Sequence, residues 1–169
     1  MTKCDKTEMI ERAMAFPLDK VIYRYRQETG LSKSEAQRHE RELKRFLALS
    51  AAAERGYGMR GPIDKLWHTF ILFTHIYENF CNKLGGGFIH HYPNVRGYDG
   101  PGAKPLAMGT RDYKRFLDDY RTTFGEAAAE PYWPAIPDPK TERFFAVDCS
   151  SDDCGNDCDG GTGGTGGDD

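Results

Sequence analysis

The chain has 169 residues, the length of one ordinary domain, and 38% of them are hydrophobic, enough to form a core. The formal net charge is -3. Residues 148–169, however, hold seven Asp and no Lys or Arg, so the preceding residues carry 23 basic and 19 acidic groups, a net charge of +4. This mild excess is too small to indicate nucleic-acid binding by itself.

Targeting signals are not evident. The first residues lead into a polar stretch rather than the apolar run of a secretory signal. No stretch approaches 18 uninterrupted apolar residues, so no membrane-spanning helix is expected. We therefore expect a soluble cytoplasmic protein whose five cysteines are reduced.

Apolar residues recur with helical spacing in five segments, which predicts an all-α fold of about five helices joined by irregular loops. The segments are 7–16, 17–30, 33–54, 63–84 and 110–125. Ser32 and Glu35 have the spacing of a capping box at the start of the third. Thr110 is the expected N-cap of the last. Gly and Pro between 94 and 109 predict an irregular loop.

The chain divides by composition into a compact helical domain, 1–147, and a tail, 148–169. Residues 126–147 should wrap the surface and be anchored through Trp133 and Phe144–Phe145. From Asp148 onward too few apolar groups are present to offset the entropy of ordering, so the tail is expected to be disordered.

The segment 63–84 carries a polar line. On one helix, Asp64, His68 and His75 fall within about 40° of each other. Asp64 and His68 are one turn apart and can share a metal ion or a hydrogen bond. His68 and His75 are two turns apart, roughly 10 Å along the axis. Bonds of ~2 Å to one ion do not span that distance, so His75 is not a predicted ligand.

The polar line is either solvated or covered by the segment that contains His90 and His91. In the covered case Ile71 and Leu72 flank the line as apolar walls, and Trp67 stands at the edge of the apolar face. Neighbouring side chains of an extended segment point to opposite sides. We therefore expect at most one of His90 and His91 to face the line.

These residues predict a candidate metal site of Asp64 and His68 with His90 or His91, taking a divalent transition metal such as zinc or iron. The spacing matches no standard metal motif. Two alternatives stay open: Asp64 orients His68 in a structural hydrogen-bond network, or the pair performs acid–base catalysis without metal. Cys81 lies on the apolar face and is expected to be a core thiol, not a nucleophile. Trp67 is expected in the core, with a pocket wall beside His68 as its alternative role.

The tail contains thiols and carboxylates, which are potential metal ligands. Cys149, Cys154 and Cys158 alternate with aspartates, and three thiols with carboxylates could hold a soft or borderline metal loosely. A structural zinc site usually needs a fourth ligand and closer pairs. A purely solubilising tail, metal capture or redox sensing, and modification or partner docking therefore remain as alternatives.

Several short motifs occur together over most of residues 40–135. They are Asp64-Lys65-Leu66-Trp67-His68, Tyr77, Phe80-Cys81, Phe88-Ile89-His90-His91-Tyr92-Pro93, and the flanks Arg45 to Leu49, Tyr57-Gly58-Met59 and Tyr120 to Trp133. In combination they resemble the glycine-rich domain-containing protein-like family. The resemblance implies a helical domain without an established activity, and its motif points to Asp64, Trp67, His68, His91 and His90. The tail here has more Asp and fewer Cys than a typical Gly–Cys repeat, which departs from that family.

The leading functional hypothesis is therefore a metal-binding protein. The rival is an interaction module without chemistry, which holds a protein partner through the tail or through basic residues of the charged 33–54 helix, namely Arg38, Arg41, Lys44 and Arg45. Glutamates alternate with those basic residues, which makes nucleic acid a poor partner.

Overall fold

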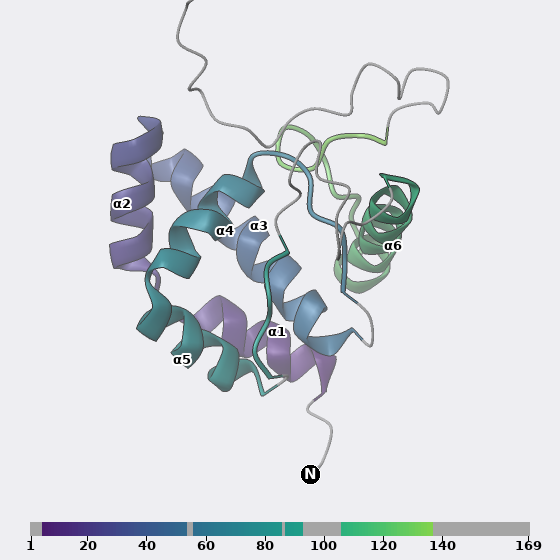
Figure 1. The fold of residues 1–169 in the computed structure, drawn as a ribbon, viewed down its shortest axis with the longest axis horizontal. Helices are drawn as coiled ribbons and strands as arrows, with labels where there is room; N and C mark the ends of the chain where they lie inside the picture. The colour runs from purple at the N-terminus through teal and green to yellow at the C-terminus, as the bar shows by residue number, and fades with distance from the viewer. Residues whose placement is uncertain (1–4, 54–55, 86, 93–105, 137–169) are drawn as a thin grey trace, which may run out of the picture.

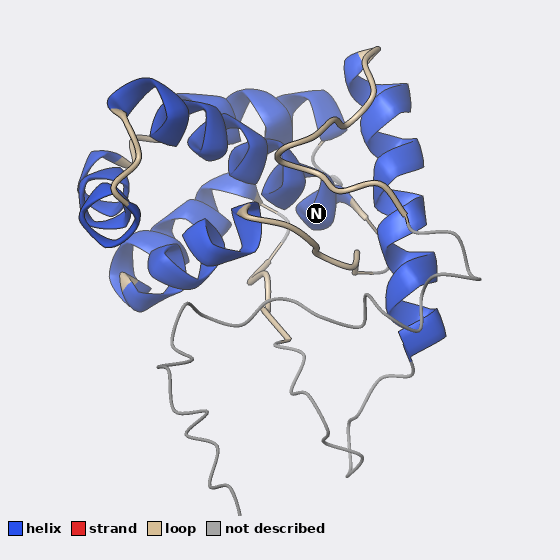
Figure 2. Ribbon diagram, turned by 90° about the horizontal axis from the view of Figure 1, so that it is seen from above, coloured by secondary structure: helices blue, strands red, loops and turns tan. Residues whose placement is uncertain are grey.

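The computed structural model describes residues 5–53, 56–85, 87–92 and 106–136. Within them the chain forms six helices and no strand, which confirms the predicted all-α fold (Figures 1 and 2). The helices are α1 (Lys6–Ala15), α2 (Asp19–Thr29), α3 (Lys33–Ala52), α4 (Ile63–Leu72), α5 (Thr74–Leu84) and α6 (Leu106–Phe124).

Helix α3 is the centre of the fold, because each of the other five helices contacts it (Figure 1). The predicted capping box is present: the Glu35 backbone N–H donates to the Ser32 hydroxyl, and Glu35 accepts from the Ser32 N–H. The apolar stripe of α3 lies in its second half, as predicted, and includes the fully buried Leu43, Phe46 and Leu47. These side chains belong to the hydrophobic core against which the other helices pack.

The predicted single helix over 63–84 was wrong, because it is broken at Phe73 into α4 and α5. Phe73 has non-helical dihedral angles, φ -86° and ψ 59°, and its N–H donates to the carbonyl of Phe70. The bend brings the rings of Phe70 and Tyr77 into edge contact at 5.0 Å in the core. Tertiary packing therefore overrides a sequence that has no Gly or Pro near the break.

Two helices begin at other residues than the sequence predicted. Helix α6 begins at Leu106, so Thr110 lies inside it and not at its N-cap, and the predicted loop does not extend to residue 109. Helix α2 begins at Asp19, two residues after Pro17. Both errors are at element boundaries, where local patterns are weakest.

The segment after α6 returns to the core, with Trp133 only 1% exposed, which confirms it as an anchor. Gly61 makes this packing possible. Its φ is +91°, and a Cβ there would lie 2.6 Å from Pro134 Cδ and 2.7 Å from the Tyr132 carbonyl oxygen. Any side chain at residue 61 would push the 132–134 segment away.

A buried histidine joins α2, α3 and the segment after α6. Nδ1 of His39 lies 2.8 Å from the hydroxyl oxygen of Tyr25, and its ring makes an edge contact with Tyr132. Burial raises the pKa of Tyr25 to about 12, so its phenol keeps its proton near neutral pH. The Nδ1 atom of a neutral His39 can therefore accept a hydrogen bond from the Tyr25 hydroxyl.

We predict that His39 makes stability fall in mild acid. Burial lowers its pKa in the folded protein below the ordinary 6.5, an effect that Glu35 and Glu42 oppose only in part. The unfolded state therefore takes up the proton first as pH falls. This contribution is fully present above pH 6.5 and is lost as pH drops towards the folded-state pKa. The free energy of unfolding, measured by urea denaturation at several pH values, should depend less on pH in His39→Gln. His75→Gln, at an exposed position, should leave this pH dependence unchanged. An equal pH dependence in both variants would refute the prediction.

Across the described residues, no helix is both long and apolar enough to cross a membrane. The predicted tail, with Cys149, Cys154 and Cys158, and the Phe144–Phe145 anchor lie outside the described residues.

Candidate metal centre

Asp64 and His68 lie one turn apart on α4, as their spacing predicted. Asp64 is only 6% exposed, whereas the side chain of His68 is 47% exposed. The helix therefore presents a buried carboxylate beside an imidazole that reaches solvent. A buried carboxylate is costly unless it is paired.

The segment 87–92 supplies the second imidazole. After α5 ends at Leu84, the chain turns back at Gly85. The side chains that follow alternate in exposure: Ile89 and His91 face the protein, and Phe88, His90 and Tyr92 face outward. This alternation brings His91, and not His90, to Asp64.

A chain of hydrogen bonds holds this segment in place. The indole N–H of Trp67 donates to the Tyr77 hydroxyl at 3.0 Å, and that hydroxyl donates to the carbonyl of Ile89 at 2.5 Å. Burial raises the pKa of Tyr77, so the phenol stays protonated and keeps its donor role. Ile89 is therefore fixed two residues before His91. The apolar pattern of 63–84 gave no sign that Tyr77 has this role.

The two oxygens of Asp64 face two different histidines. Nε2 of His91 lies 3.0 Å from Oδ1, and Nδ1 of His68 lies 3.7 Å from Oδ2. One potential ligand atom from each residue falls within 4.8 Å of the other two, close enough to hold a metal ion. The rings of His68 and His91 meet at 4.5 Å between centroids.

Trp67 supports this centre from the core side. It is 6% exposed, as expected of a core residue. The centroid of its ring lies 4.4 Å from the centroid of the His91 ring. Ile71 is partly buried against the core, and Leu72 is 76% exposed. The structure thus places Trp67 against the cluster and turns Leu72 to solvent.

The remaining histidines of the region lie apart from the cluster. His90 is exposed between the rings of Phe88 and Tyr92, at 4.9 and 6.2 Å. His75 is exposed on α5, beyond the break at Phe73, with its Nε2 3.4 Å from the amide nitrogen of Asn79. The exclusion of His75 by distance therefore agrees with its position.

The geometry suits both metal ligation and a hydrogen-bond network. At 3.0 Å, His91 and Asp64 are within hydrogen-bond distance, but 3.7 Å between His68 and Asp64 is too long for one. Two ligands of a tetrahedral ion with bonds of about 2.0–2.1 Å lie roughly 3.3 Å apart. Metal binding would therefore bring the exposed His68 ring closer to Asp64 and His91 than it lies in this structure. Cys81 is fully buried and burial raises the pKa of its thiol, as expected of a core thiol.

Two of the four basic residues of α3 that were predicted to bind a protein partner already form ion pairs within the fold. Lys44 is buried and pairs with Glu40 at 2.6 Å, and Arg45 pairs with Glu126 at 2.6 Å. Arg38 and Arg41 remain exposed. Partner binding through this helix stays a prediction that rests on these two residues.

Comparison with known proteins identifies a family. The model of the UCP032817-like family matches residues 6–97, more than half of the chain. The chain belongs to the UCP032817-like family. The matched region spans α1 to α5 and contains Asp64, His68 and His91. Neither the curated proteins nor the solved structures contain a match to this chain.

Proposed function

We propose that this member of the UCP032817-like family binds one divalent transition-metal ion through Asp64, His68 and His91. The observation that carries the proposal is the convergence of three potential ligand atoms within 4.8 Å, although the residues come from two segments 23 or more positions apart. A carboxylate and two imidazoles form a donor set that zinc and iron both accept.

The environment supports a site with an open position. Asp64 and His91 are largely shielded by the protein, while His68 stands at the surface. Three protein ligands would leave at least one coordination position for water on the exposed side. Such a position allows a metal ion to act as a Lewis acid or to lower the pKa of its bound water.

Zinc is the better first candidate of the two metals. Nitrogen and oxygen sites generally bind Zn²⁺ more tightly than Fe²⁺. Two histidines and one carboxylate with open positions also match non-haem iron(II) sites, so iron is the alternative to be measured.

The test is metal content and zinc titration of the full chain in which Cys149, Cys154 and Cys158 are all replaced by Ser. This background removes the thiols of the alternative candidate site in the tail. We expect about one zinc per chain by elemental mass spectrometry and by calorimetric titration. Zinc at 100 times its dissociation constant should raise the free energy of unfolding by about 2.7 kcal/mol.

Histidine variants provide matched controls in the same background. His68→Ala and His91→Ala should each abolish stoichiometric binding, whereas His75→Ala and His90→Ala should leave it intact. Metal that binds equally in all four variants would refute the site. Metal lost with the three cysteines would move the site to the tail, and iron in place of zinc in the purified protein would change only the identity of the metal.

Kinship with the glycine-rich domain-containing protein-like family stays a prediction. The matched family carries another description, and residues 148–169 lie outside the matched region. Both the motif resemblance and the family match include Asp64, His68 and His91, which makes these residues the first to substitute.

A further inference from the structure

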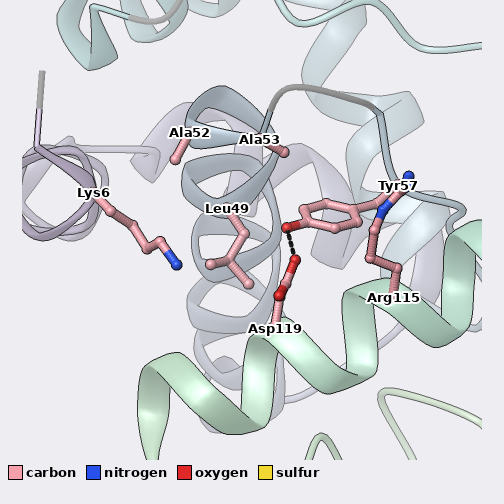
Figure 3. A pocket seen from close by; sticks show the side chains of 7 residues that line it. All are labelled: Lys6, Leu49, Ala52, Ala53, Tyr57, Arg115 and Asp119. Atoms are coloured by element: carbon pink, nitrogen blue, oxygen red, sulfur yellow. Dashed lines mark hydrogen bonds between the residues drawn. The ribbon is translucent and has the colours of Figure 1, made fainter. Parts of the chain in front are cut away.

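A cavity of about 390 Å³ lies between α1, α3 and α6 (Figure 3). This volume is at the lower end of the range of small-molecule sites. Its apolar wall is formed by the end of α3, through Leu49, Ala52 and Ala53. None of the metal-cluster residues lines it.

Opposite charges enter this cavity from different walls. Figure 3 shows the Lys6 side chain reaching in from α1 and the Asp119 carboxylate from α6, with Leu49 between them. The ammonium of Lys6 lies 3.4 Å from the Thr123 hydroxyl, and among the described residues no carboxylate lies within ion-pair distance of it. Lys6 is thus available to an anionic group of a ligand.

The carboxylate of Asp119 is held in a fixed orientation. Tyr57 donates its hydroxyl proton to Oδ2 of Asp119, and the Arg115 guanidinium lies over the Tyr57 ring at 5.6 Å. Arg115 is itself bound to the Gly56 carbonyl and to Asp112. The guanidinium is therefore balanced by Asp112. Among the described residues no hydrogen bond or ion pair uses the second oxygen of Asp119, which leaves it for a cationic donor in the cavity.

We propose that this cavity binds a free α-amino acid with an aliphatic side chain. The ligand carboxylate would pair with Lys6, its ammonium with Asp119, and its side chain would lie on Leu49, Ala52 and Ala53. Opposed charges beside an apolar wall match a zwitterion better than a simple anion or amine. The proposal is independent of the metal centre.

The experiment is calorimetric titration of the full chain with L-leucine. Two further probes each lack one charge: 4-methylpentanoate has no ammonium, and 3-methylbutylamine has no carboxylate. We expect L-leucine to bind and both other probes to bind about tenfold or more weakly, since each loses a charged hydrogen bond.

Variants assign the two charges. Lys6→Ala and Asp119→Asn should each weaken L-leucine binding by about tenfold or more. Exposed matched controls, Lys20→Ala and Asp118→Asn, should leave it unchanged, as should His68→Ala. Absence of L-leucine binding, equal binding of 4-methylpentanoate, or unchanged binding in both pocket variants would each overturn the proposal. If Asp119→Asn destabilises the protein, Lys6→Ala and the two probes still decide the question.

Discussion

Glu42→Ala is expected to lower the free energy of unfolding by about 3–5 kcal/mol, the effect of removing one partner from a buried charged network. Glu42 lies on α3 and is buried. Its Oε2 accepts the Trp133 indole N–H at 2.7 Å and the Tyr120 hydroxyl at 2.9 Å. Its other oxygen lies 3.4 Å from Arg45. Alanine would leave buried donors of α6 and of the following segment without their acceptor.

Urea denaturation of two companion variants checks the cause of this loss. Glu42→Gln keeps an acceptor oxygen and should cost less than Glu42→Ala. Glu11→Ala, at an exposed position of α1, should change stability by no more than about 0.5 kcal/mol. A loss below about 1 kcal/mol for Glu42→Ala would show that Tyr120 and Trp133 find other partners.

The same glutamate shows where sequence reasoning stops. In the sequence, Glu42 is one acidic residue among alternating basic ones, the pattern of a solvated helix face. It is buried because α6 and Trp133 cover it, and these lie 78 and 91 positions further along the chain. Local patterns carry no information on contacts at such separations. The capping box at Ser32 and Glu35, by contrast, is local and was predicted correctly.

The metal centre also combines features that the sequence predicts with features that it does not. The pairing of Asp64 with His68 follows from one helical turn and was predictable. Alternation along an extended segment predicted that one of His90 and His91 would face inward. The choice of His91 depends on how the 87–92 segment lies against α4 and α5, and this segment is held by the hydrogen bond from Tyr77, on α5 after the break at Phe73, to the Ile89 carbonyl. Neither the break nor that hydrogen bond has a sequence signal.

Trp67→Ala is expected to lower the free energy of unfolding by about 3–5 kcal/mol and to weaken zinc binding as well. The indole fills the core against Phe46, 5.4 Å between ring centroids, and supports His91 at 4.4 Å. Its loss leaves a cavity and removes the donor to Tyr77. Groups that orient metal ligands typically contribute about 10–100-fold to metal affinity. Urea denaturation without metal and zinc titration measure the two effects separately.

Two substitutions separate packing from orientation. Trp67→Phe keeps an aromatic ring but loses the N–H, and should cost about 1–3 kcal/mol because the buried Tyr77 hydroxyl oxygen loses its donor while its own hydrogen bond to Ile89 remains. Leu72→Ala, at a position 76% exposed on the same helix, should leave both stability and zinc affinity nearly unchanged. If Trp67→Ala destabilises the protein but binds zinc as tightly as the parent chain, the indole serves only the core. His91 would then be held by Asp64 and the 87–92 segment alone.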